Sequence, residues 1–356
     1  MLHIWMGRAR TGKSERVLKK LAELGDSSQQ ILLVPEHASH VAEMDVCRAC
    51  GDAASRHAEV LTFKLLATRV LGICGGSAEV TLDSGGKLLT LQRALTELAP
   101  ALKVYRRASQ RAAFLESLLA VMEELQAYAV EPETLAEKVE DLEGESGDKL
   151  RDIALLYGVY LARLHAPGRD AREALQKLEE NLEASEYIDN KDVFLDGFSY
   201  FTGRELRILR ILLRRSKSVT VTLLGDTDDR ELFSASLRVR EQLFALARDA
   251  GVPCTEETME TGEARGALDH IERCFFGPAR TMSGGTDAVA LYEAGSAYSE
   301  CEWVASQILE LVRGQGCRYR DVTVTARDLE SYADALQTVF ARFGIPLYYA
   351  RRSDIL

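Results

Sequence analysis

Residues 2–14 read Leu2-His3-Ile4-Trp5-Met6-Gly7-Arg8-Ala9-Arg10-Thr11-Gly12-Lys13-Ser14, and this stretch decides the fold. Its first part is a short apolar run typical of a strand, and the residues from Glu15 to Leu24 have helical composition. Between them, the turn matches the spacing G-x-x-x-x-G-K-[ST] of a phosphate-binding P-loop. A strand, this turn and a helix, in that order, are the context that the motif requires.

The residue types of this turn suit the phosphates of a nucleotide. Glycines let the backbone bend so that its N–H groups surround the phosphates, and the helix N-terminus adds positive potential. We expect Lys13 to reach the β and γ phosphates and the Ser14 hydroxyl to bind Mg²⁺. Arg10 stands where many P-loops have glycine, which predicts either a stiffer loop or a direct contact between Arg10 and a phosphate. All eight residues of the turn are predicted to bind nucleotide: Gly7, Arg8, Ala9, Arg10, Thr11, Gly12, Lys13 and Ser14.

The overall composition excludes several classes of protein. With 356 residues, 46% of them hydrophobic and 28% charged, the chain is long enough for two or three ordinary globular domains. It contains no apolar run near the roughly 20 residues of a membrane span, and no leader precedes the first strand, so we expect a cytoplasmic protein without a membrane partner. The net charge of −11 argues against a protein that binds nucleic acid through its overall electrostatic field, although the charge is compatible with a local basic groove.

The seven cysteines are an odd number scattered through a long chain, which does not indicate a disulfide framework. Cys47 and Cys50 form the one close pair in the sequence. They would hold a metal only with a second pair nearby, so ordinary buried thiols are the preferred interpretation.

Strand and helix signals alternate along two parts of the chain. Strands are predicted over residues 30–35, 58–63, 191–197 and 218–226, and helices over 39–50 and 64–71. Thr202 is predicted to cap a helix through Arg215, with Glu205 as its capping-box partner. Together with the P-loop, this order predicts an α/β fold with a doubly wound parallel sheet that binds ligands at the carboxyl ends of its strands.

The remaining segments indicate the domain organisation. Helical spacing dominates from about residue 82 to 186, so we assign 1–75 plus 190–285 to a first α/β domain and 76–189 to a helical insertion. Residues 255–285 are predicted to be mostly a surface connection. A second α/β domain is predicted over 286–356, with strands at 288–292, 321–326 and 345–350 and helices at 299–313 and 329–343. Because this second unit does not close, we expect the N-terminal part of a longer protein.

Two basic stretches are candidates for phosphate contact, and a solvated helix face is the alternative for both. One has arginines at helical spacing, namely Arg204, Arg207, Arg210 and Arg214. The other is Lys103-Val104-Tyr105-Arg106-Arg107 with Arg111.

Five ordered motifs resemble the AddB subunits of the bacterial AddAB (RecBCD-like) helicase-nucleases. Besides the P-loop, they are Leu33-Val34-Pro35-Glu36, Val60-Leu61-Thr62-Phe63-Lys64, Phe194-Leu195-Asp196-Gly197-Phe198 with Phe201-Thr202, and Tyr319-Arg320-Asp321-Val322 through Arg327-Asp328. The resemblance spans nearly the whole chain. It implies a P-loop NTPase of superfamily 1 helicase-like architecture, with 1–75 plus 190–285 as a 1A-like motor domain, 76–189 as a 1B-like insertion and 286–356 as a truncated 2A-like domain. It also implies a nuclease domain with an iron–sulfur cluster beyond this chain, so none of the seven cysteines is assigned to that cluster.

The resemblance implies that the P-loop binds ATP, and it also implies roles for particular residues outside the P-loop. Asp196 matches the Mg²⁺-associated aspartate, and Arg327 matches an arginine that reaches the γ-phosphate, where a cation stabilises transferring charge. Thr62 and Phe63 match a strand-end pair that contacts single-stranded DNA. Stacking of a base on Phe63 would contribute roughly 1 to 3 kcal/mol. A core aromatic that closes the strand is the alternative for Phe63.

One departure from the family's pattern concerns hydrolysis. A working motor of this class has glutamate directly after the Mg²⁺ aspartate, and this chain has Gly197. Loss of general-base assistance typically costs about 10² to 10⁴ in rate. Asp226 is a possible substitute, although it follows a different strand. We therefore expect ATP binding with little or no hydrolysis, and we assign no catalytic residue.

The sequence is compatible with three functions. The resemblance implies an ATP-binding member of a heterodimer with an AddA-like motor and nuclease subunit, which acts in double-strand-break repair by recombination. Such a protein would bind single-stranded DNA and a short regulatory, Chi-like sequence. The alternatives are a self-contained P-loop kinase or ATPase, against which the insertion and second domain argue, and a scaffold with a vestigial P-loop.

Overall fold

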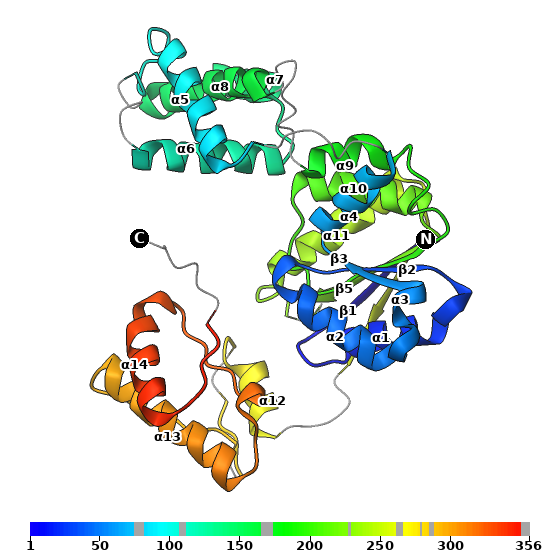
Figure 1. Cartoon of the computed structure of the whole chain (residues 1–356), viewed down its shortest axis with the longest axis vertical. Coiled ribbons are helices and arrows are strands. Elements are labelled where there is room, and N and C mark those ends of the chain that lie inside the picture. The colour runs from blue at the N-terminus through cyan, green and yellow to red at the C-terminus, as the bar shows by residue number, and fades with distance from the viewer. Residues whose placement is uncertain are drawn as a thin grey trace. The chain divides into compact units, whose positions relative to one another are not determined.

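The computed structural model describes residues 1–74, 82–106, 112–164, 174–226, 229–260, 266–277, 280–284 and 288–349. The chain forms two compact units, Met1–Glu263 and Ala264–Leu356. The first unit contains the sheet and the helical insertion (Figure 1).

The sheet of the first unit has six strands in the order β3-β2-β4-β5-β1-β6, and every neighbouring pair is parallel. The strands are β1 (Leu2–Gly7), β2 (Gln30–Leu33), β3 (Ala58–Leu61), β4 (Asp192–Leu195), β5 (Ser218–Leu224) and β6 (Cys254–Thr258). Because the strands are parallel, all their carboxyl ends lie at one edge. The predicted α/β class with a parallel sheet is confirmed.

Helices cover both faces of this sheet, as Figure 1 shows for α1 and α2 on one side and α4, α10 and α11 on the other. On β2, Ile31 and Leu33 belong to one core and Leu32 to the other. Since successive side chains of a strand point to opposite faces, this double burial requires a continuous apolar run. The helices around the sheet are α1 (Lys13–Leu24), α2 (Ser39–Cys50), α3 (Ala54–His57), α4 (Phe63–Cys74), α9 (Ala174–Leu182), α10 (Gly203–Arg215) and α11 (Ser234–Asp249).

The helical insertion has a hydrophobic core of its own. Its helices are α5 (Ser84–Leu98), α6 (Ala112–Ala127), α7 (Pro132–Glu140) and α8 (Gly144–Leu164). Leu91, Met122 and Tyr157 are among the buried residues of this core. In contrast, Leu178 and Leu182 of α9 belong to the core that the sheet shares with α4, α10 and α11. Helix α9 therefore packs with the sheet, although the sequence places it in the segment 76–189.

The prediction that residues 255–285 are mostly a surface connection is wrong. Strand β6 pairs in parallel with β1, and α12 (Ala267–Cys274) forms a helix. The reason is that β6 is an edge strand with exposed polar residues at alternate positions, so its sequence lacks the apolar run of the central strands.

The three strands predicted in the second unit are also wrong, because its described residues contain no strand. Residues 288–292, 321–326 and 345–349 lack ladder pairing, and residue 350 lies outside the described residues. The helices are present, as α13 (Ala297–Gly314) and α14 (Ala333–Phe343). Val322 and Val324 pack against these helices, while Thr323 between them is exposed. The alternation of apolar and polar residues therefore arises because one side of the segment is covered, and the backbone is not paired with another strand of the described residues.

The predicted capping box at the start of α10 is confirmed. The Thr202 Oγ1 accepts the Glu205 N–H at 3.3 Å, and the Glu205 Oε2 accepts the Thr202 N–H at 2.8 Å. Two N–H groups that the helix leaves unpaired are thereby satisfied.

Thr202→Ala is expected to lower the free energy of unfolding by about 1 kcal/mol, because α10 loses its cap. Ser199→Ala, at an exposed position of the same loop, is the matched control. Urea unfolding followed by circular dichroism measures both variants, and equal stability of the two would contradict the role of the cap.

Candidate functional site

The P-loop sequence lies at the carboxyl end of β1, where it turns into α1. A Cβ on Gly7 would lie 2.5 Å from the Thr11 Oγ1 and 2.7 Å from the Met259 carbonyl oxygen, so a side chain does not fit there. Gly12 is the N-cap of α1 with φ of 79°, and no side chain caps the helix. The glycines of the motif therefore let the backbone turn sharply and leave the helix N-terminus open to a ligand.

The Lys13 ammonium lies inside this turn. Its Nζ donates to the carbonyl oxygens of Gly7 and Arg8, both at 2.7 Å, and to the Thr11 Oγ1 at 3.3 Å. Burial lowers the pKa of Lys13, and the negative charge of Asp196 opposes that shift. The ammonium is thus bound by the turn's own oxygens and interacts electrostatically with the carboxylate that follows β4.

Asp196 follows β4 at the same edge of the sheet. Its N–H donates to the Leu33 carbonyl at 3.0 Å, and its Oδ1 accepts a hydrogen bond from the Thr222 hydroxyl of β5. Sequence reasoning missed Thr222, although the alternation of threonine and valine along β5 indicates one polar face. The Ser14 hydroxyl is in the first turn of α1 and is exposed.

The Asp196 carboxylate and the Ser14 hydroxyl are oxygen donors that fit the chemistry of Mg²⁺, which binds one or two protein oxygens together with phosphates and water. The described residues contain no group of three or more His, Cys, Asp or Glu side chains arranged to hold a metal. A Mg²⁺ ion at this edge would therefore depend on a nucleotide for its remaining ligands.

Gly197 and Asp226 are the two positions that the sequence raised in connection with a general base. Gly197 has φ of 82°, a conformation in which a side chain is strained. Asp226 accepts a hydrogen bond from the Arg8 Nε at 2.6 Å, and Asp229 lies 3.5 Å from the same guanidinium. Arg8 also lies 5.2 Å from the centre of the Phe233 ring. Asp226 is therefore engaged in an ion pair with the P-loop, which the neighbouring positions of β1 and β5 in the sheet make possible.

Thr62 and Phe63, the predicted DNA contacts, have structural partners. The Thr62 Oγ1 accepts the Leu65 N–H at 3.2 Å, and Phe63 is the first residue of α4. The Phe63 side chain is 5% exposed, with its ring edge-on to Phe198 at 5.6 Å between centres. This burial favours the core aromatic interpretation, and contact with DNA stays a prediction. Arg327 is exposed in the second unit, and its contact with a phosphate stays a prediction as well.

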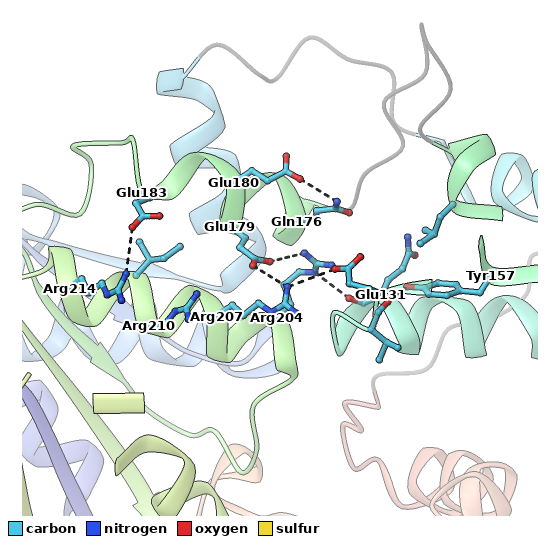
Figure 2. A pocket seen from close by; sticks show the side chains of 14 residues that line it. Glu131, Tyr157, Gln176, Glu179, Glu180, Glu183, Arg204, Arg207, Arg210 and Arg214 are labelled. Atoms are coloured by element: carbon cyan, nitrogen blue, oxygen red, sulfur yellow. Dashed lines mark hydrogen bonds and ion pairs between the residues drawn. The ribbon is translucent and has the colours of Figure 1, made fainter. Parts of the chain in front are cut away.

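The arginines of α10 face acidic and backbone groups around a pocket of about 350 Å³. Figure 2 shows Arg204 reaching Glu179, and their Nη1 and Oε2 atoms are 2.8 Å apart. Arg207 donates to the Ala129 carbonyl at 3.1 Å, Arg214 lies 3.8 Å from Glu183, and Arg210 is exposed. The carboxylates balance much of this positive charge, which favours a structural role for Arg204 and Arg207 over phosphate contact.

The second basic stretch begins where Asp152 holds the backbone. Its carboxylate accepts the N–H groups of Lys103, Val104 and Tyr105 at 2.8 to 3.1 Å. The Lys103 side chain is 2.9 Å from Asp148. Arg107 and Arg111 lie outside the described residues, so phosphate contact by this stretch stays a prediction.

The cysteine pair is not fully buried: Cys47 is exposed and Cys50 is half-buried. Burial raises the pKa of the Cys50 thiol, and Cys47 adds to that shift. A raised pKa disfavours the thiolate that a metal requires.

Fold and turn together define an α/β protein with a doubly wound parallel sheet and a G-x-x-x-x-G-K-S sequence at the carboxyl end of one strand. A family model described as "ADDB, N-terminal" matches residues 4–272, so the chain belongs to this family. The resemblance drawn from the five motifs is confirmed.

Several curated relatives are named as the B subunit of an ATP-dependent helicase/deoxyribonuclease. That of Thermoanaerobacter sp. (strain X514) is 32% identical over 365 residues, which cover 98% of this chain and 32% of the relative. That of Desulforudis audaxviator (strain MP104C) is 33% identical over 374 residues, covering 99% and 32%. The Clostridium perfringens (strain 13 / Type A) relative is 30% identical over 370 residues, covering 99% and 32%. The chain thus spans about a third of the length of these relatives. None of the helices that the structure describes has the length and apolarity to cross a membrane.

Proposed function

We propose that this chain is the ATP-binding, helicase-like part of a protein that works with an AddA-like motor and nuclease subunit on broken DNA. In this role it binds single-stranded DNA, contributes to recognition of a Chi-like sequence, and supports double-strand-break repair by recombination. The relatives' name, which describes one part of an ATP-dependent helicase/deoxyribonuclease, supports this proposal.

The main structural support is that Lys13, after β1, and Asp196, after β4, follow the carboxyl ends of parallel strands at one edge of the sheet. On nucleotide binding, Lys13 would exchange the Gly7 and Arg8 carbonyls for phosphate oxygens, which are the stronger acceptors. Ser14 and Asp196 would hold Mg²⁺, which supplies positive charge against the phosphates. The uncapped first turn of α1 would direct its N–H groups at the same anion.

Hydrolysis is expected to be negligible in the chain as given, with and without single-stranded DNA, because Gly197 offers no base. Gly197→Glu is expected not to restore it. The backbone there is left-handed, and a side chain in that conformation costs about 1 to 2 kcal/mol. The new carboxylate would therefore shift the loop that follows Asp196 instead of adopting a productive position.

The experiment measures the affinity for a fluorescent ATP analogue with Mg²⁺, together with phosphate release, for the parent, Gly197→Glu and Gly197→Ala. Gly197→Ala is the control for backbone strain. Measurable binding without release supports the proposal, whereas rapid DNA-stimulated release by the parent would refute the silent site. Phosphate transfer to a small acceptor without DNA would favour a kinase, and absence of nucleotide binding would favour a scaffold.

A further inference from the structure

Arg10 adopts a backbone conformation that its residue type disfavours. Its φ is 60°, and among the described residues the other non-glycines with positive φ are Ala129 and Asn190. Non-glycine residues persist in this region only where the surrounding structure determines them, and such strain clusters at ligand sites. Glycine would occupy the position without strain. A strained and exposed arginine within the P-loop therefore requires an explanation.

The other cations of the turn already have partners, which sets Arg10 apart. Arg8 is paired with Asp226, and the Lys13 ammonium is bound by two carbonyl oxygens. Arg10 is exposed and forms no hydrogen bond or ion pair with the described part of the chain. Its guanidinium is thus the charge of this turn that a ligand would meet without breaking an existing contact.

The chemistry of guanidinium identifies the kind of ligand. Its planar array of donors matches a phosphate bidentately, and the group stays charged at any physiological pH. Arg10 is three residues from Lys13, whose ammonium would meet the β and γ phosphates. The backbone N–H groups of the turn would surround the inner phosphates, which leaves the terminal phosphate, with its unshared oxygens, as the ligand for the exposed guanidinium.

We propose that Arg10 binds the terminal phosphate and makes the site prefer a nucleoside triphosphate to a diphosphate. This inference rests on the proposed nucleotide binding and adds a specificity-determining residue to it. Arg10 would thereby distinguish ATP from ADP at a site that, by the same proposal, binds ATP without hydrolysing it.

The test is competition of ATP and of ADP against a fluorescent ATP analogue with Mg²⁺, in the full chain. Arg10→Gly removes the charge and the strain, and it is expected to lower the ratio of ATP to ADP affinity about tenfold, the effect of one charge-assisted contact. Arg10→Lys keeps a charge without the bidentate geometry and should give an intermediate ratio. Lys19→Ala removes an exposed positive charge from α1, outside the turn, while keeping Arg10, and should leave the ratio unchanged.

The outcomes separate this inference from the proposed function. An unchanged ratio in Arg10→Gly, with both nucleotides bound by the parent, overturns the inference and leaves nucleotide binding intact. An equal fall of the ratio in Lys19→Ala also overturns it, because the loss of any positive charge near the site would then be the cause. If the parent binds neither nucleotide, the inference and the proposed function fall together.

Discussion

Lys13→Ala is expected to weaken binding of a fluorescent ATP analogue with Mg²⁺ at least about 100-fold. The ammonium lies inside the turn and would donate to two phosphates, and each hydrogen bond to a charged group contributes about 1.5 to 3 kcal/mol. Since each 1.4 kcal/mol is a factor of about ten, two such contacts account for this loss. Fluorescence anisotropy of the bound analogue measures the change in affinity.

The control is Lys19→Ala, which removes the same charge from an exposed position of α1. This variant should bind the analogue like the parent. Lys13→Ala also releases the Gly7 and Arg8 carbonyls from the ammonium, so thermal melting must show that the fold is retained. Equal affinity of two stably folded variants would exclude the turn as a phosphate site.

Most of the sheet was predictable because buried parallel strands require continuous apolar runs. The runs at β2 and β4 are of this kind, and both strands formed where the sequence indicated. Strand β6 was not predictable in this way, because an edge strand exposes part of its surface and its polar sequence resembles a loop. In the described residues of the second unit a strand was predicted where none forms. The alternation of apolar and polar residues around Val322 and Val324 indicated a strand, but a strand also needs a neighbouring strand to pair with, and local sequence does not show whether one is present.

The candidate site shows the same division between local and tertiary information. The place of the P-loop and the capping box of Thr202 follow from fixed local spacings, so sequence was sufficient. The link from Arg8 to Asp226 joins residues 218 positions apart, and only the strand order brings them together. The burial of Phe63 depends equally on tertiary packing, which is why its two interpretations stayed open until the structure showed the ring against Phe198.

The start of α10 is where the loop after Asp196 meets the helical insertion. A Cβ on Gly203 would lie 2.4 Å from the Tyr128 carbonyl oxygen and 3.0 Å from its carbon, so the two backbones pack in direct contact. Beside this contact, Arg204 donates to the Gln126 carbonyl at 3.2 Å. Close backbone packing and a buried guanidinium thus hold the end of α6 against α10.

Gly203→Ala is expected to lower the free energy of unfolding by about 1 to 3 kcal/mol, the usual cost of overpacking. The neighbouring group is backbone, so it has no rotamer through which to move away, and any shift would also lengthen the hydrogen bond of Arg204. The expected loss exceeds that of Thr202→Ala, because separation of the two backbones affects several contacts at once.

Gly158→Ala in α8 is the matched control, since its Cβ would meet only the Pro132 Cβ at 3.7 Å, an ordinary contact. Alanine favours a helix over glycine by up to about 1 kcal/mol, so this variant should be as stable as the parent or more so. Urea unfolding compares the two. If Gly203→Ala matches Gly158→Ala, the backbones at Gly203 and Tyr128 do not touch in solution, and the loop after Asp196 is not held against the insertion.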